Sequence, residues 1–177
     1  LLADFFIAHS GPAAWYQLEA SDSDPTVFLS HLIESIRRMR TAGKKASKIG
    51  QNAQSLLNSA ESGVDSRRVL TVLINELSEQ IHDSLLIILE DYHFVASPIV
   101  HQLLDYLLEN APTALHFIIS TRTDPPIALA RLRARGLLSE LRANDLRFND
   151  EEVATLLRRE VPDISSESFV DEAICVR

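Results

Sequence analysis

A continuous apolar run that ends in two carboxylates decides the fold of this chain: Leu85-Leu86-Ile87-Ile88-Leu89-Glu90-Asp91. An uninterrupted apolar strand is typical of a parallel sheet whose two faces are both covered by helices. In such sheets the chemistry gathers at the carboxyl ends of the strands, which is where these two carboxylates stand. The run therefore predicts a central strand and the edge of the sheet at which a functional site should be sought.

Helical and extended patterns alternate on both sides of this run. Apolar residues recur at helical spacing in three long segments, residues 25–40, 66–82 and 97–110. Shorter helices are predicted at residues 1–9, with the spacing of a buried face, at residues 127–135, closed by Gly136, and at residues 149–160. Further strands are predicted at residues 13–19, 115–120 and 137–142, and residues 41–66 form a long connection with one short helix. We therefore expect an α/β fold with three layers around a mostly parallel sheet.

Composition and charge limit the function classes. The 177 residues are 46% hydrophobic and 24% charged, which is typical of a globular domain. The formal net charge of -8 gives no positive field for DNA, RNA or anionic lipid. The one cysteine, Cys175, cannot form an internal disulfide, and no apolar run is long enough to cross a membrane. We expect a cytoplasmic segment that binds neither nucleic acid nor membrane directly.

The pair Glu90 and Asp91 at the tip of a buried strand has the pattern of a Walker B site. Hard oxygen ligands at this place can bind Mg²⁺ directly or through water, and one of them can orient an attacking water. The alternative is that two acidic residues simply mark where a buried strand meets solvent. The motif alone leaves both interpretations open.

Polar residues also end the next predicted strand, as Ser120, Thr121 and Arg122. A guanidinium at a neighbouring strand tip could report the presence of a γ-phosphate through bidentate contacts. Alone, Arg122 would be interpreted as a surface arginine, but its nearness to the acidic tip favours a site. The histidines His93 and His101 have no third ligand at metal-site spacing, and we interpret them as core or surface residues.

Five stretches taken in order resemble the ATPase domain of MalT-like, large ATP-binding regulators of the LuxR family: residues 14–19, 22–32, 89–93, 120–136 and 140–152. The resemblance covers about residues 1–161 and implies a STAND-type P-loop NTPase. In that family ATP and a small-molecule inducer promote self-association, and a distant helix-turn-helix binds promoter DNA. The resemblance implies that Glu90 and Asp91 position Mg²⁺ and water, and that Arg122, with Ser120 and Thr121, contacts the nucleotide. Many relatives have Asp at position 90, so which carboxylate binds Mg²⁺ stays open.

One motif of that family does not occur in these 177 residues. A Walker A loop, G-x-x-x-x-G-K-[ST], provides backbone N–H groups and a lysine for the phosphates. None of the five glycines stands in that pattern. In relatives the loop comes just before a helix like residues 1–9. We therefore expect a partial NTPase core in residues 1–148, lacking its first strand and P-loop, and the truncated start of a helical lid subdomain in residues 149–177.

Two hypotheses about function follow. In the first, the segment belongs to an ATP-dependent switch that controls transcription, and these residues alone bind ATP weakly or not at all. In the second, the segment is a non-catalytic α/β interaction or scaffold domain with no nucleotide chemistry. A missing first strand is also expected to leave the central strand, residues 85–89, with an uncovered edge, which would make the segment unstable or self-associating.

Overall fold

The computed structural model describes residues 2–39, 48–59, 65–82 and 84–160. The chain divides into two compact units, Leu1–Ala128 and Leu129–Arg177. Part of the predicted connection, residues 41–47 and 60–64, and the chain after residue 160 lie outside the described residues. The predicted domain boundary between residues 148 and 149 stays a prediction.

Three parallel strands form the sheet of the first unit, in the order β1-β2-β3. They span Ala13–Gln17, Leu85–Glu90 and Leu115–Ile119. The middle strand β2 is the predicted central strand, and Leu86 pairs with Ala13 while Leu85 pairs with Leu115. The predicted uncovered edge of this strand is wrong, because β2 is hydrogen-bonded on both sides. Within the described residues, the open edges belong to β1 and β3.

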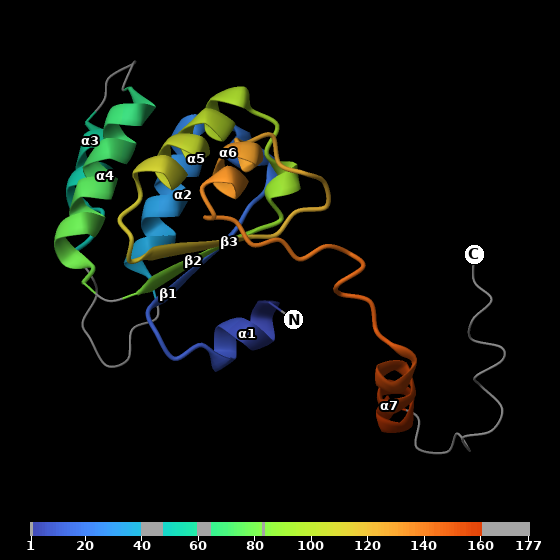
Figure 1. Cartoon of the computed structure of the whole chain (residues 1–177). Helices are drawn as coiled ribbons and strands as arrows, with labels where there is room; N and C mark the ends of the chain where they lie inside the picture. The colour runs from blue at the N-terminus through green and yellow to red at the C-terminus, as the bar shows by residue number, and fades with distance from the viewer. Residues whose placement is uncertain (1, 40–47, 60–64, 83, 161–177) are drawn as a thin grey trace. The chain divides into compact units, whose positions relative to one another are not determined.

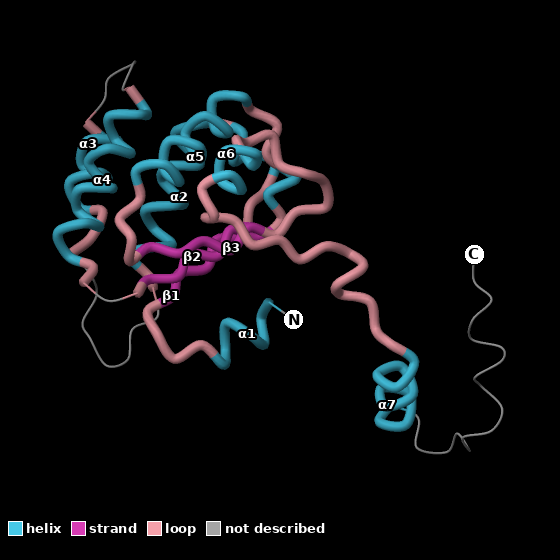
Figure 2. Tube along the Cα trace, viewed as in Figure 1, coloured by secondary structure: helices cyan, strands magenta, loops and turns pink. Residues whose placement is uncertain are grey.

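Helices lie on both sides of the sheet, as the three-layer α/β prediction requires. Figures 1 and 2 show α2 (Pro25–Arg37), α4 (Ser66–Gln80) and α5 (Pro98–Asn110) on one side and α1 (Leu2–Ala8) on the other. The short helix predicted within the long connection is α3 (Gln51–Asn58), which packs against α4. The α/β architecture is therefore confirmed, with one thick helical layer and one thin layer.

Alternation along the strands sorts their side chains onto these two layers. Ala14, Tyr16, Ile87 and Leu89 join the large core with α2, α4 and α5. The opposite face holds Ala13, Leu86 and Ile88, with Trp15, Ile118 and Phe6 packed against them. This second face is also apolar, and within the described residues α1 is the helix that packs on it.

The prediction that residues 1–9 form a helix with a buried face is confirmed for the helix and wrong for the burial. No residue of α1 is buried, and Ile7 is 73% exposed. Phe6 alone packs on the sheet from this helix through an aromatic contact, edge-on to Trp15 with ring centroids 5.2 Å apart. A seven-residue helix has too few turns to bury a continuous apolar stripe.

Several helix boundaries follow from the capping residues in the sequence. The Asp24 carboxylate accepts hydrogen bonds from the backbone N–H groups of Thr26 and Val27, at 2.8 and 3.1 Å, at the start of α2. Asp65 begins α4 in the same way. Ser97 occupies the predicted N-cap of α5 but its side chain makes no capping bond, so Pro98 at the first turn is the main local signal.

The second unit contains α6 (Leu129–Ala134) and α7 (Asp150–Glu160). Gly136, with φ of 67°, ends α6 as predicted. Asn149 and Glu152 form the predicted capping box, with each side chain accepting from the other's backbone N–H at 2.9 Å.

The strand predicted at residues 137–142 is wrong. The Leu137 N–H donates to the Leu132 carbonyl, and the Arg142 N–H donates to the Asp145 carboxylate at 2.8 Å. The Glu140 carboxylate binds the guanidinium groups of both Arg133 and Arg142. Backbone N–H groups that a strand would use for pairing are therefore hydrogen-bonded within local turns and to side chains.

Glu76 links two helices of the first unit. Its side chain is 5% exposed, and its carboxylate accepts from the N–H groups of Asn52 at 3.0 Å and Ala53 at 3.3 Å. These N–H groups belong to the first turn of α3, whose N-cap residue Gly50 has no side chain to cap it. A carboxylate from α4 thus replaces the missing local cap and also meets the positive end of the α3 dipole.

We expect Glu76→Ala to lower the free energy of unfolding by about 1–3 kcal/mol, because it removes a charged acceptor from two N–H groups. The matched control is Glu79→Ala, an exposed glutamate one turn further along α4, which should change stability by less than about 0.5 kcal/mol. Urea unfolding followed by circular dichroism measures both. Equal effects of the two substitutions would contradict the capping role of Glu76.

Candidate functional site

The three strands end at the same edge of the sheet because they are parallel. Gln17 of β1 is paired with Glu90 of β2, and Leu89 of β2 is paired with Ile119 of β3. The residues that follow each strand therefore meet at this edge, which Figure 1 shows beside the start of α5. The predicted acidic pair and the predicted Ser-Thr-Arg tip come from adjacent strands, as the sequence indicated.

Glu90 is the last residue of β2 and is partly buried. Its Oε2 accepts a hydrogen bond from Trp15 Nε1 at 3.1 Å. Trp15 lies on the α1 side of the sheet, so the indole holds the Glu90 carboxylate on that side. This contact was not apparent from the sequence, since the two residues are 75 positions apart.

Asp91 leaves the strand in the left-handed conformation, with φ of 59° and ψ of 37°. No other non-glycine residue of the described chain has a positive φ. Its N–H donates to Ser120 Oγ at 3.0 Å, and the next N–H, that of Tyr92, donates to the Ser120 carbonyl at 2.9 Å. A strained backbone held by a neighbouring strand tip is a feature that concentrates at functional sites.

The three residues predicted to contact phosphate differ in their hydrogen bonds and in their exposure. Ser120 touches Asp91 directly, and the Thr121 hydroxyl donates to the Thr123 carbonyl at 2.8 Å. Arg122 is exposed at the turn that follows β3. The structure thus brings Asp91 and Ser120 into contact, while the roles assigned to Glu90, Asp91, Ser120, Thr121 and Arg122 stay predictions.

A buried polar network stands directly behind the acidic tip. The Tyr92 hydroxyl is hydrogen-bonded to His101 Nδ1 at 2.8 Å, and both side chains are buried. Burial raises the pKa of Tyr92, and the nearby Asp105 carboxylate raises it further. Burial lowers the pKa of His101, against the opposing effect of Asp105. This network anchors the residue after Asp91 to α5, and it explains His101 as a core histidine.

His93 packs beside the acidic tip. Its ring lies 4.4 Å from that of Phe94 between centroids, and its Nδ1 lies 3.9 Å from Asp91 Oδ1. Neither ring nitrogen has a hydrogen-bond partner within the described residues. No cluster of three or more His, Cys, Asp or Glu side chains suited to a metal ion occurs among the described residues.

A second buried carboxylate follows β1, and sequence reasoning missed it. Asp22 is 1% exposed; its Oδ2 accepts from the Glu19 N–H at 2.7 Å, and its Oδ1 lies 2.8 Å from His31 Nδ1. Burial raises the pKa of the Tyr16 hydroxyl, and the neighbouring Asp22 carboxylate raises it further. In sequence Asp22 stands in a Ser/Asp-rich turn, and only its spacing of nine residues from His31 on α2 could have suggested the pair.

Comparison with known proteins finds sequence similarity to segments of two kinds of larger protein. It is 27% identical over 164 residues to the HTH-type transcriptional regulator MalT of Vibrio cholerae, covering 92% of this chain and 17% of that protein. It is 32% identical over 147 residues to MalT of Yersinia enterocolitica, covering 82% and 15%. It is 34% identical over 145 residues to the serine/threonine-protein kinase PknK of Mycobacterium tuberculosis, covering 81% and 12%. No model of a known protein family matches the chain.

The similarity extends over most of this chain but over a small part of each relative. The chain spans less than a fifth of the length of these curated relatives. Over most of its own length it is homologous to one segment of MalT transcriptional regulators and of PknK kinases. Within the described residues, no helix is both long and apolar enough to cross a membrane.

We expect Asp91→Gly to raise the free energy of unfolding by about 0.5–1 kcal/mol, because glycine adopts the left-handed conformation without the cost that a side chain brings. Asp91→Ala, which removes the same carboxylate but keeps a Cβ, should give no such gain. Thermal and urea unfolding of both variants measure this. A glycine variant no more stable than the alanine variant would contradict strain at this position.

We expect the pH dependence of stability to report the buried neutral state of His101. Its lowered pKa means that the unfolded chain binds the proton more tightly, so stability should fall as pH drops below about 6.5, by at most about 1.4 kcal/mol per pH unit. His101→Asn, which does not titrate, should show a smaller loss between pH 7 and 5 than the parent. His116→Asn, at an exposed strand position, is the control and should keep the parental slope. Parallel profiles for all three proteins would contradict this origin of the pH dependence.

Proposed function

We propose that this chain is part of the nucleotide-binding ATPase segment of a large, ATP-dependent regulator. The observation that carries the proposal is the meeting of two strand tips, where the strained Asp91 donates its N–H to Ser120 Oγ. A carboxylate fixed beside a neighbouring strand tip is what a Mg²⁺-nucleotide site requires. Homology to segments of MalT and PknK agrees with a regulatory protein of this kind.

Mg²⁺ would be held chiefly by Asp91. Mg²⁺ sites commonly use one or two carboxylates, with water and the phosphate oxygens completing the shell. The Asp91 side chain is 34% exposed, whereas one oxygen of Glu90 already accepts the Trp15 N–H. These carboxylates fit the ion, which would neutralise the charge of the phosphates. Glu90 is then better suited to orienting the attacking water.

Arg122, with Ser120 and Thr121, would contact the phosphates from the neighbouring tip. The exposed guanidinium of Arg122 has the freedom to bind a γ-phosphate when that group is present. Ser120 has a further role in this proposal, because its hydroxyl fixes the backbone of Asp91. The phosphate-binding loop itself would come from a segment other than these 177 residues.

In the complete regulator, we propose that ATP and a small-molecule inducer favour self-association, and that promoter DNA is bound by a separate domain. Cytoplasmic localisation follows from that role. The alternative, a scaffold domain without nucleotide chemistry, makes the opposite prediction for substitutions at the strand tips, because it assigns them no chemical role.

The test uses a longer chain of the same gene product that includes a phosphate-binding loop. Asp91→Asn should lower the ATP hydrolysis rate by at least about tenfold, because it removes a charge that acts on the transition state. Arg122→Ala should instead reduce the preference for ATP over ADP, since its contact needs the γ-phosphate.

Arg38→Ala is the matched control for Arg122. Arg38 is 79% exposed and lies just after the last turn of α2, away from the strand tips, so neither hydrolysis nor nucleotide preference should change. Hydrolysis is measured by phosphate release and nucleotide preference by calorimetry. If Asp91→Asn and Arg122→Ala both behave like the parent, the scaffold alternative is favoured.

A further inference from the structure

The hydrogen bond between Trp15 and Glu90 crosses the sheet diagonally. Trp15 is paired with Ile88, and Glu90 is paired with Gln17, so the indole reaches two residues along the neighbouring strand. Its Nε1 lies 3.1 Å from Glu90 Oε2. A diagonal neighbour lies within reach of aromatic and long side chains. Among the described residues, Gln17 stands directly opposite Glu90 but makes no hydrogen bond to it, so Trp15 is the residue of β1 that holds this carboxylate.

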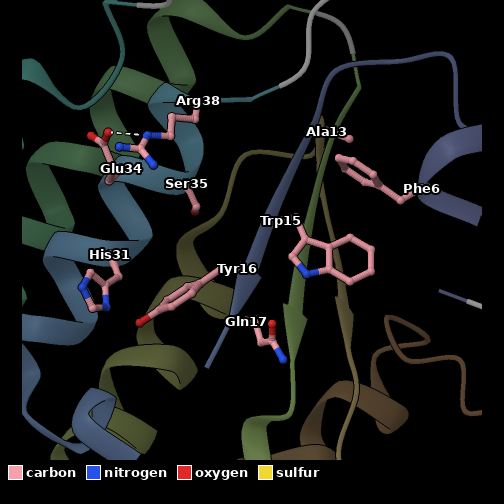
Figure 3. A pocket seen from close by; sticks show the side chains of 9 residues that line it. All are labelled: Phe6, Ala13, Trp15, Tyr16, Gln17, His31, Glu34, Ser35 and Arg38. Atoms are coloured by element: carbon pink, nitrogen blue, oxygen red, sulfur yellow. Dashed lines mark hydrogen bonds and ion pairs between the residues drawn. The ribbon is translucent and has the colours of Figure 1, made fainter. Parts of the chain in front are cut away.

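Packing fixes the indole on the α1 side of the sheet. Phe6 meets it edge-on, with ring centroids 5.2 Å apart, and Ile88 and Ile118 belong to the same apolar cluster. Figure 3 shows Trp15 and Phe6 together on one side of β1, with Tyr16 on the other side. An indole side chain has two rotatable bonds, so these contacts leave it little freedom. The N–H is therefore directed at the carboxylate by packing as well as by the hydrogen bond itself.

The chemistry of the indole suits this contact. An indole N–H is a donor that carries no charge and has no acceptor. A lysine or arginine in its place would bring a positive charge that competes with Mg²⁺ for the carboxylate. The indole instead leaves the negative charge of Glu90 in place and occupies one of its two oxygens. The other oxygen, Oε1, has no donor among the described residues, and Glu90 is only partly buried, so Oε1 can accept from water.

We propose that Trp15 is a positioning residue for Glu90: it fixes one carboxylate oxygen so that the other accepts from the water that attacks the γ-phosphate. This inference rests on the proposed function, in which Glu90 orients that water. An acceptor already held in one orientation needs no rearrangement in the transition state, whereas a free side chain does. Trp15 itself contacts neither nucleotide nor water in this role, so it should affect the rate of hydrolysis and not the binding of Mg-ATP.

Steady-state hydrolysis by the longer chain that includes a phosphate-binding loop tests the inference. Trp15→Phe keeps an aromatic ring beside Phe6 and removes the N–H donor. It should lower kcat by about tenfold, the factor expected for one hydrogen bond to a charged group, and keep KM for Mg-ATP within about twofold of the parent. Gln17→Ala, on the same face of β1 and opposite Glu90, is the matched control and should change neither constant.

The same substitution in a Glu90→Gln background separates positioning from a general effect on the fold. If Trp15 acts through Glu90, Trp15→Phe should lower kcat in the parent but not lower it further in the Glu90→Gln variant. A loss of equal size in both backgrounds, or no loss in the parent, would overturn the inference and leave the proposed role of Glu90 intact. A Glu90→Gln variant that hydrolyses ATP as fast as the parent would instead contradict the proposed function, and the positioning role with it.

Nuclear magnetic resonance tests the contact itself without nucleotide. Trp15 is the single tryptophan of the 177 residues, so its indole N–H gives one signal in a proton–nitrogen correlation spectrum. Glu90→Gln replaces a charged acceptor with a neutral one, and the signal should move to lower proton chemical shift because the hydrogen bond becomes weaker. Glu34→Gln makes the same change of charge on α2, on the other side of the sheet, and should leave the signal in place. A signal that responds equally to both substitutions, or to neither, would overturn the inference.

Discussion

Hydrogen bonding of β2 to a parallel strand on each side is the constraint on which both core and site depend. Leu86 bonds toward β1, whereas Leu85 and Leu89 bond toward β3, so the backbone of this apolar strand is satisfied within the sheet. Its side chains can then all be apolar, since one set enters the large core and the other faces α1. The same parallel pairing makes all three strands end at one edge.

The regular ladder stops at Asp91, and that interruption gives the edge its chemical character. In a continuing strand the Asp91 N–H would find a backbone carbonyl of β3. The Asp91 N–H donates to the Ser120 hydroxyl instead, because the left-handed turn changes the direction of the backbone. Tyr92, anchored by His101 in the core, prevents the turn from relaxing back into the strand. The carboxylate is therefore positioned by backbone geometry and by packing behind it, at a cost in conformational energy.

Residue patterns predicted those parts of the fold whose causes are local. The apolar run of β2, the cap at Asp24 and the capping box at Asn149 and Glu152 depend on neighbours in sequence, and each was found. Contacts between distant residues were missed, such as the hydrogen bond from Trp15 to Glu90 and the pair of Asp22 with His31. The strand predicted at residues 137–142 failed because a short apolar pattern cannot distinguish pairing from turns that satisfy the backbone locally.

The hydrogen bond between Trp15 and Glu90 gives the molecule a built-in optical reporter. Trp15 is the single tryptophan of the chain, and its indole N–H lies 3.1 Å from a carboxylate oxygen at the strand tip. Indole emission depends on the charge close to the ring, so any ion or ligand that draws this oxygen away changes the colour and intensity of the fluorescence. The fluorescence spectrum of the unlabelled protein therefore depends on the chemical state of the acidic tip.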